Sequence, residues 1–379
     1  MSGKARLINR CAKRTPKLTI NRLSLIIAFK TMSTIKELLS DIFEANSKAF
    51  DSLLKLLEIP YSESSAVLEL ADSVRKKFCG SGILLRGIIE FSSYCKNNCY
   101  YCGLNAGNRK IERYRMNEVE ILEAVREVYK TGIRTVVLQS GEDSDYDWDM
   151  FTHVVKKIKK EFDVQITLSC GEQEQKLYES WKKAGADRYL LKIETSNKKL
   201  YERLHPKMNF DSRLECLHIL KKLGFQTGSG IIIGLKDQTA EDIANDIMFF
   251  SKEDFDMIGI NPFISHCESM LKNYPDGDPH LTIKTVALTR IVTKNAHLPA
   301  TTALGSINKD KDLRENALMA GANVIMPNFT PYKYRKQYEI YPGKRCLKEN
   351  ADIVGYLEKM AKKTGRVLDF SKGDSLKGN

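Results

Sequence analysis

Three cysteines lie close together in the chain, at Cys95, Cys99 and Cys102, with three residues between the first two and two between the last two. Three thiolates on one tight loop can ligate three irons of a 4Fe–4S cluster, because thiolate is the usual protein ligand of iron–sulfur clusters. The fourth iron would then lack a protein ligand and stay open to a chelating substrate or cofactor. One lysine and two asparagines separate the first two cysteines, which predicts a loop and argues against three ordinary core thiols.

Zinc is the alternative metal for such a cluster of thiols. A structural zinc site needs four ligands, usually in pairs with two to four residues between the members of a pair. The chain has no second Cys-x-x-Cys pair and no histidine pair at metal-ligand spacing. We assign no metal to the lone histidines, such as His205, His266 and His280.

The number and spread of the cysteines indicate the redox state of the chain. Nine cysteines, an odd number, without a secretory signal favour reduced thiols over a disulfide scaffold. Four scattered cysteines are interpreted as ordinary core or surface thiols: Cys79, Cys170, Cys216 and Cys267.

The elements that must position these residues are expected to be alternating strands and helices. Short β-rich runs lie at 83–91, 134–139, 164–169, 187–193, 227–235, 256–262, 299–304 and 322–327. Helix-period segments lie near 117–131, 149–161, 172–184, 211–223, 239–252, 282–295, 311–320 and 350–364. Eight strands, each followed by a helix, predict an α/β fold of the closed (β/α)8 TIM-type barrel. A doubly wound open sheet is the alternative.

The remaining regions differ in composition from the barrel. Residues 1–31 hold eight of the twelve excess positive charges and no acidic residue, so the rest of the chain gives little reason to expect a nucleic-acid partner. This segment is interpreted either as a mitochondrial-type transit peptide before Met32, or as an upstream extension or disordered tail. We expect N-terminal helices at 32–80, the barrel at 81–348, and a C-terminal helix and tail at 349–379.

Active sites of (β/α)8 barrels lie at the carboxyl ends of the strands. Ser140, Gly141 and Glu142 follow the second expected strand, and Ser169 and Glu194 end the third and fourth. A glycine at position 141 would let the backbone approach a ligand closely, although a plain turn between strand and helix explains the same residues.

Two cations, Arg86 and Lys192, lie inside β-rich segments, where a buried charge is costly unless it is paired. A bound anionic substrate is one such partner. An internal salt bridge, for instance between Arg86 and Glu90, is the other.

The cysteine loop resembles the signature of the radical S-adenosylmethionine (SAM) superfamily, C-x3-C-x-aromatic-C after the first barrel strand, with Tyr101 as the aromatic residue. The resemblance implies that the amino and carboxylate groups of SAM chelate the fourth iron. It also implies that one electron cleaves SAM to methionine and a 5′-deoxyadenosyl radical, which attacks a substrate inside the barrel.

Further blocks narrow the resemblance to HydE, the family of FeFe-hydrogenase maturases. These blocks are 88–92, 99–104, 113–116, 137–143, 184–191, 299–305, 322–328 and 341–344, and the resemblance covers about residues 36–365. Methylornithine synthase and biotin synthase share the cysteine loop and the barrel but match the last blocks less well.

The resemblance implies two sets of site residues besides the three cluster cysteines. The expected SAM-binding residues are Tyr101, Ser140, Gly141, Glu142, Ser169, Glu194, Ser196 and Arg213. The expected residues of the catalytic lumen are Arg86, Gln139, Thr167, Lys192, Thr301, Thr302, Met326, Tyr338 and Tyr341. Arg213 would hold the SAM carboxylate, unless it is an ordinary solvated helix residue. Lys192 departs from the arginine that is frequent in the family, and it lacks the planar fork of a guanidinium.

A second cluster is not expected, because only Cys346 is present where some family members have three cysteines, and the other two positions are Val354 and Leu357. The expected cofactors are therefore one 4Fe–4S cluster and SAM.

The implied function is hydrogenase H-cluster assembly on an organometallic iron–cysteine precursor. The implied partners are the maturases HydG and HydF and an electron donor such as ferredoxin. A methylornithine- or biotin-synthase-like enzyme acting on a small amino-acid substrate, and a non-catalytic iron–sulfur or zinc-binding protein, are the alternatives.

No apolar run reaches the ~20 residues of a membrane-spanning helix, so we expect a soluble protein with no membrane partner. Its expected compartment is the matrix of a mitochondrion-related organelle, such as a hydrogenosome, if residues 1–31 are a transit peptide. The cytoplasm is expected otherwise.

Overall fold

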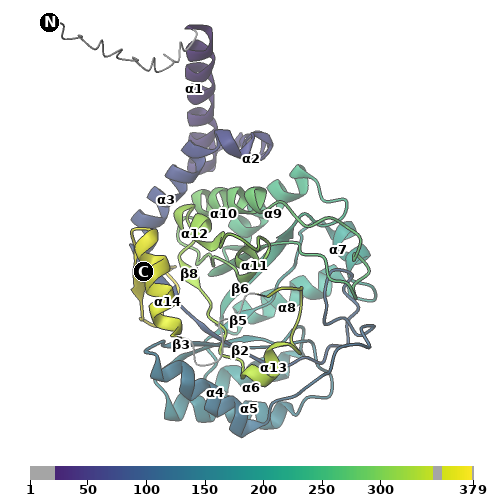
Figure 1. Ribbon diagram of the computed structural model, residues 1–379. Helices are drawn as coiled ribbons and strands as arrows, with labels where there is room; N and C mark the ends of the chain where they lie inside the picture. Colours follow the sequence, from purple (N-terminus) through teal and green to yellow (C-terminus); the bar gives the residue numbers. More distant parts are fainter. Residues whose placement is uncertain (1–21, 345–351, 378–379) are drawn as a thin grey trace, which may run out of the picture.

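The computed structural model describes residues 22–344 and 352–377, and Figure 1 shows the arrangement of their helices and strands. Most of the basic N-terminal segment, together with Cys346, lies outside the described residues. Among the described helices, none combines the length and the apolar character that a membrane-spanning segment needs.

Six parallel strands form most of the barrel wall. They are β2 (Gly87–Ser92), β3 (Thr135–Ser140), β4 (Gln165–Ser169), β5 (Arg188–Leu190), β6 (Gln226–Ile233) and β7 (Met257–Pro262), paired in chain order. Their side chains are buried on both faces, as expected of a parallel sheet that has helices on its outer side.

Isolated backbone bridges close the barrel between its first and last strands. Met257 bridges to His297, and Pro299 bridges to Val324 of β8 (Val324–Ile325). Strand β8 pairs with β1 (Gly82–Leu85), and Ile88 of β2 bridges to Asn328. The ring of parallel segments is therefore closed. This confirms the predicted barrel and excludes the alternative fold, an open doubly wound sheet.

Two expected strands differ from the structure. The run 83–91 is divided at Arg86 into β1 and β2, because β1 pairs with β8 and β9 (Val367–Asp369) while β2 pairs with β3. The run 299–304 is not a strand, since helix α11 (Thr302–Ser306) begins within it. Pro299 has no backbone N–H and cannot continue a ladder of hydrogen bonds.

Eight helices have bounds that lie within three residues of the expected segments. They are α4 (Glu118–Lys130), α5 (Trp148–Glu161), α6 (Gln175–Ala184), α8 (Phe210–Lys222), α9 (Ala240–Glu253), α10 (Pro279–Thr293), α12 (Arg314–Met319) and α14 (Ile353–Lys363). Helices α4, α5 and α6 lie on one side of the barrel, and α9, α10 and α12 on the opposite side (Figure 1). Besides α11, two short helices were not expected: α7 (Lys198–Leu204) and α13 (Tyr332–Arg335).

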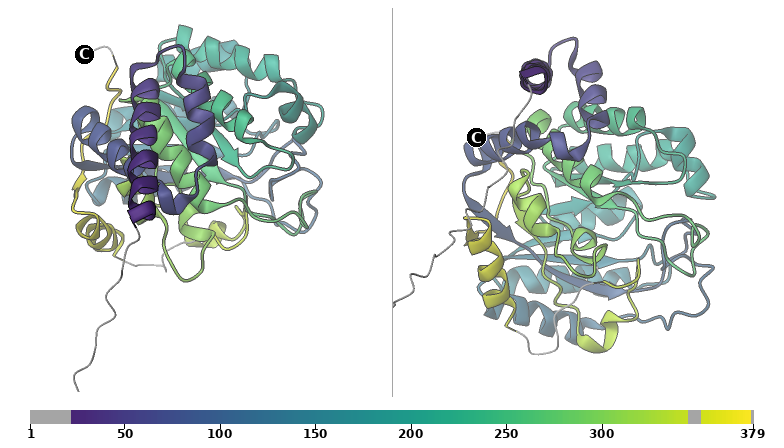
Figure 2. Two further views of the ribbon diagram at one scale, coloured as in Figure 1. Left: turned by 90° about the horizontal axis from the view of Figure 1, so that it is seen from above. Right: turned by 45° about the horizontal axis from the view of Figure 1, so that its top comes forward.

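The N-terminal helices pack on the outside of the barrel. Helix α2 (Ala49–Glu58) packs on α9, and α3 (Ser65–Cys79) packs on α10. Helix α1 (Arg22–Glu44) begins upstream of the expected start at residue 32 and ends at Glu44, because the positive φ of 52° at Ala45 stops the helix. Figure 2 shows α1 at the outer surface of the molecule.

The C-terminal tail completes the base of the barrel. Strand β9 pairs with β1, and the residues after it contact the first residues of β3, β5 and β6. The buried guanidinium of Arg188 donates to the carbonyl oxygens of Lys372 (2.7 Å) and Gly373 (3.0 Å) and to the Asp374 carboxylate (2.8 Å). The tail thus packs against the barrel, although we predicted it as a region separate from the barrel.

Candidate functional site

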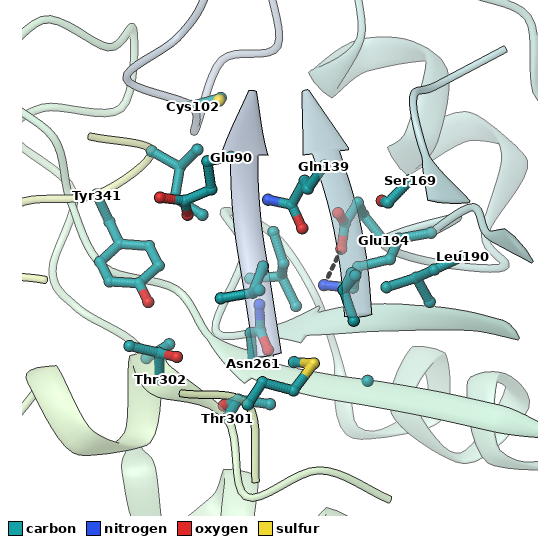
Figure 3. Close-up of a pocket in the computed structure, with 18 of the residues that line it drawn as sticks. Glu90, Cys102, Gln139, Ser169, Leu190, Glu194, Asn261, Thr301, Thr302 and Tyr341 are labelled. Carbon is teal, nitrogen blue, oxygen red and sulfur yellow. Dashed lines mark ion pairs between the residues drawn. The ribbon is translucent and has the colours of Figure 1, made fainter. Parts of the chain in front are cut away.

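A cavity of about 320 Å³ lies inside the barrel at the carboxyl ends of its strands. It is lined by the three cysteines of the loop and by every residue expected to bind SAM or to line the lumen, with the exception of Ser196. Figure 3 shows Cys102 at one end of this space and Thr301 and Thr302 at the other, with Glu90 and Gln139 between them. The structure therefore brings residues from the cysteine loop and from most strands of the barrel into one site.

Backbone contacts hold the cysteine loop over the mouth of the barrel. The Lys96 N–H donates to the Glu142 carbonyl oxygen (2.9 Å), and the Gly103 N–H donates to the Ile340 carbonyl oxygen (2.9 Å). A Cβ atom at Gly141 would lie 2.2 Å from the Tyr94 carbonyl oxygen. Gly141 is therefore required by the close approach of the cysteine loop, a reason that the strand–turn pattern did not reveal.

The three thiols lie close to one another and are largely removed from solvent. Burial, together with the charge of the neighbouring thiols, raises the pKa of Cys99 well above its usual range and that of Cys102 to about 12. Burial also raises the pKa of Cys95. These groups are protonated without a metal, so a bound cluster must displace their protons and supply the positive charge that holds them as thiolates.

This donor set fits an iron–sulfur cluster better than zinc. Within residues 22–344 and 352–377, no three histidine, cysteine or acidic side chains surround a point that a single metal ion could occupy. A structural zinc site needs a fourth ligand, whereas three thiolates can hold a four-iron cube and leave one of its irons open.

Arg213, at the start of α8, is buried beside the cavity and is not a solvated helix residue. Its Nε atom lies 3.0 Å from Glu172 Oε1, and its Nη1 atom lies 3.9 Å from Glu142 Oε2. Burial opposes its charge, but Tyr201, Glu172 and Glu142 together raise the pKa of Arg213. Glu172, which sequence analysis missed, has its own pKa raised by burial and is a second carboxylate on this cation.

Lys192 and Glu194, just after β5, form an ion pair inside the cavity. The Lys192 Nζ and Glu194 Oε2 atoms are 2.9 Å apart, and the dashed line in Figure 3 marks this contact. Gly230 makes room for the lysine stem, since a Cβ atom at this position would lie 2.7 Å from Lys192 Cε and 2.1 Å from the Gly259 carbonyl oxygen. The cation expected to face an anionic substrate and the carboxylate expected to face SAM are therefore partners in this structure.

Arg86 lies at the floor of the cavity and is almost fully buried. Its Nη1 atom contacts the Met257 sulfur at 2.7 Å, its Nη2 atom donates weakly to the Gly373 carbonyl oxygen at 3.4 Å, and its Nε atom has no partner among the described residues. Burial and the nearby Arg188 lower the pKa of Arg86. The floor therefore holds a poorly paired cation.

The suggested salt bridge between Arg86 and Glu90 is not formed. Glu90 instead makes a short ion pair with Lys344 and accepts from Asn328 Nδ2 at 3.0 Å. Glu90, Lys344 and Asn261 line the cavity and were not predicted as site residues. An acidic residue inside a β-rich run could have indicated Glu90 as a site residue. Lys344 gave no such indication, because the Tyr-Pro-Gly segment before it predicts only a turn.

Hydroxyl groups complete the lumen. The Thr167 Oγ1 atom has no hydrogen-bond partner among the described residues, and Thr301 Oγ1 donates to the Ile260 carbonyl oxygen at 3.5 Å. Gln139 Nε2 donates to the Tyr338 hydroxyl at 3.1 Å. Thr302 and Tyr341 lie on the same side of the space (Figure 3).

Ser196 lies away from the cavity. Its backbone N–H and its hydroxyl both donate to Oδ1 of Asp246 on α9, at 2.5 Å and 2.6 Å. Ser196 thus anchors the start of α7 to α9, and this geometry gives no support for the expected SAM contact.

The sequence model of the radical SAM superfamily matches residues 89–250 of the chain. This part holds the cysteine loop and the first strands of the barrel. The closed barrel, the three thiols at its mouth and this match define a radical SAM enzyme. The chain is 44% identical over 336 residues to the [FeFe] hydrogenase maturase subunit HydE of Thermotoga maritima, covering 87% of this chain and 92% of that protein. The chain therefore belongs to the HydE family of the radical SAM superfamily.

Two more distant relatives share this architecture. The 3-methylornithine synthase of Methanosarcina acetivorans is 28% identical over 287 residues, covering 75% of this chain and 80% of that protein. The crystal structure of methylornithine synthase (PylB) superposes with a TM-score of 0.76 at 24% identity, covering 88% of this chain and 97% of that one. This structural likeness shows the shared fold alone.

Proposed function

We propose that the chain acts in the maturation of [FeFe] hydrogenase, as a radical SAM enzyme that modifies an organometallic iron–cysteine precursor of the two-iron subcluster. The observation that carries the proposal is the cavity itself. Three thiols lie at its mouth and a poorly paired cation lies at its floor, inside one closed barrel. The high identity to the Thermotoga maritima maturase supports the same reading.

Cys95, Cys99 and Cys102 would hold one 4Fe–4S cluster, and Arg213, Glu142 and the backbone around Gly141 would bind SAM beside it. When reduced and bound, these cofactors supply a 5′-deoxyadenosyl radical. Arg213 offers a guanidinium that holds a carboxylate through two hydrogen bonds, and Glu172 and Glu142 keep that guanidinium charged and oriented. Glu194 offers a carboxylate in the same part of the cavity.

The substrate class follows from the unpaired polar atoms of the lumen. Arg86 Nε and Thr167 Oγ1 are buried and lack partners among the described residues, which is costly until a ligand supplies an acceptor. A carboxylate or another small anion meets both needs, and Lys192 adds a second cation to the lining of the same cavity. The carboxylate of an iron-bound cysteine belongs to this class of anion.

The apolar wall protects the reaction. Side chains such as Leu190, Ile258 and Met326 line the cavity between its polar ends. They exclude water from the space in which a carbon radical would meet the substrate. The C-terminal tail closes the opposite end of the barrel.

The partners proposed for this site are HydG, which would deliver the iron precursor, HydF, which would receive the product, and a one-electron donor such as ferredoxin. A methylornithine-synthase-like activity on an amino acid is the second candidate. The 28% identity to 3-methylornithine synthase favours it, and an amino-acid carboxylate would also satisfy the floor of the cavity.

Anaerobic reconstitution followed by a SAM-cleavage assay tests the proposal. We expect about four irons and four sulfides per chain, lost in a variant with all three loop cysteines changed to alanine. SAM cleavage should increase with the product of HydG and not with lysine. Conversion of lysine to methylornithine, without a response to the iron precursor, would establish the second candidate instead.

A further inference from the structure

A buried histidine outside the predicted site contacts the cysteine loop. The His205 Nε2 atom lies 2.7 Å from the Tyr101 hydroxyl, and its Nδ1 atom lies 2.7 Å from the Tyr201 carbonyl oxygen. A carbonyl oxygen only accepts, so Nδ1 carries the proton and Nε2 of the neutral ring accepts from the Tyr101 hydroxyl. Burial lowers the pKa of His205 to about 3, in agreement with a neutral ring.

Packing fixes the orientation of this imidazole. The His205 ring stacks on Tyr201 with 4.1 Å between the ring centroids and meets the edge of Tyr101 at 5.3 Å. A backbone hydrogen bond also joins the two segments, since the Tyr100 N–H donates to the Leu204 carbonyl oxygen at 3.0 Å. The imidazole therefore has little freedom to turn away from Tyr101.

The same contacts continue to the proposed SAM carboxylate site. Arg213 Nε donates to the Tyr201 hydroxyl at 3.2 Å. A continuous series of side chains thus runs from Tyr101 through His205 and Tyr201 to Arg213. Tyr101 and Arg213 both line the cavity, while His205 does not.

We propose that His205 is a positioning residue for Tyr101, which lies between Cys99 and Cys102 in the chain. By holding the Tyr101 side chain, His205 fixes the wall of the SAM site that the cysteine loop forms. The inference rests on the proposed binding of SAM in this cavity. A buried phenol hydroxyl that loses its acceptor seeks another partner, and the ring must move to reach one. That movement changes the wall of the SAM pocket on the side of the cysteine loop.

A double-mutant cycle tests this role. The variants are Tyr101→Phe, which removes the donor, His205→Phe, which keeps a ring but removes the acceptor, and the combination of both. SAM affinity is measured on reconstituted protein from the change that SAM causes in the EPR spectrum of the reduced cluster. Each single variant should weaken SAM binding by about two- to tenfold, the value of one hydrogen bond, and the double variant should be no weaker than the worse single one.

Three controls separate positioning from a general loss of structure. His205→Gln, which keeps an acceptor near the Nε2 position, should restore part of the affinity. Tyr146→Phe removes another buried hydroxyl bond, to the Met116 carbonyl oxygen at 2.7 Å, and should leave SAM affinity unchanged. Iron content should stay the same in all of these variants.

Two results would overturn the inference: a Tyr101→Phe variant that binds SAM as the parent does, or losses that add fully in the double variant. The first result is decisive even if His205→Phe fails to fold. Failure of the proposed function gives a different result, since the parent protein would then show no SAM-dependent change at all.

Discussion

At the residue scale, the pair of Lys192 and Glu194 decides how charge is distributed inside the lumen. Lys192 is largely buried, and its ammonium is neutralised by a carboxylate 2.9 Å away. If a bound ligand formed its own contact with the Glu194 carboxylate, the Lys192 ammonium would lose its partner and would need another anion. We propose that Lys192 can exchange this internal partner for a bound anion, so the ion pair does not argue against a role in binding.

We expect Lys192→Met to reduce SAM cleavage that depends on the iron precursor by about ten- to a hundredfold, the value of a hydrogen bond to a charged group. Cleavage without the precursor should change less, because the cluster loop and Arg213 are untouched. The measurement is SAM consumption with and without the HydG product. Lys130→Met, which removes an exposed ion pair with Glu127, is the matched control, and equal stimulation in both variants would contradict the assignment.

Arg213 is the second residue whose environment makes a prediction. It is buried against Glu172 and Glu142, so Arg213→Ala removes the cation that the two carboxylates share. SAM binding should weaken by up to about a hundredfold, since a charge-assisted pair contributes roughly 1.5–3 kcal/mol. Iron content should stay constant, and SAM titration of the reduced cluster measures the change. A variant with the affinity of the parent would remove Arg213 from the site.

At the scale of elements, the junction of β5 with α7 is held by one carboxylate of α9. Asp246 accepts two hydrogen bonds from Ser196 and is fully buried, and burial raises its pKa to about 7 even though the bonds from Ser196 lower it. In the unfolded chain this carboxyl ionises near pH 3.8. Between these two values the folded state binds more protons than the unfolded state, so raising the pH through this window destabilises the fold.

We therefore expect Asp246→Asn to keep the acceptor for Ser196 and to remove this pH dependence. The melting temperature of the parent should fall relative to that of the variant between about pH 4 and pH 7, by an amount that corresponds to a few kcal/mol at most. Thermal unfolding at a series of pH values measures the difference. Parallel curves for the two proteins would show that Asp246 does not titrate in this range.

At the scale of the whole molecule, the C-terminal tail closes the base of the barrel through contacts with many strands. Arg188 donates to two of its carbonyl oxygens, and the His297 Nε2 atom contacts the Asp374 carbonyl oxygen at 2.8 Å. Burial lowers the pKa of His297 to about 3, so this ring is neutral. The tail satisfies buried polar groups that no local segment could reach.

Deletion of residues 371–379 should lower the melting temperature by several degrees, because the Arg188 guanidinium then loses its partners inside the barrel. It should also raise the cleavage of SAM in the absence of substrate, because water enters the lumen from below. Calorimetry and 5′-deoxyadenosine formation measure the two effects. A truncated protein that melts and cleaves SAM like the parent would show that the tail only covers the surface.

Much of the fold and of the site could be predicted from local spacing. The cysteine loop follows from three thiols within one polar, turn-rich segment, because such a short stretch of chain can wrap around one cluster. The eight main helices of the barrel follow from apolar periodicity, because a helix buries one face whatever it packs against. The strand ends that line the cavity follow from the rule that barrel sites lie at the carboxyl ends of parallel strands.

Only the tertiary structure decided which charged groups meet. Glu90 pairs with Lys344, more than 250 positions away, and not with Arg86 on its own strand. Ser196 donates to Asp246 of helix α9, and Arg188 donates to Asp374 of the C-terminal tail. These outcomes depend on the closure of the barrel, which brings distant segments together through packing that no local pattern records. The sequence by itself thus determined the chemistry at the mouth of the barrel, whereas tertiary contacts decided the charge pairing within it, because burial forces each polar group to take whichever partner the fold places within reach.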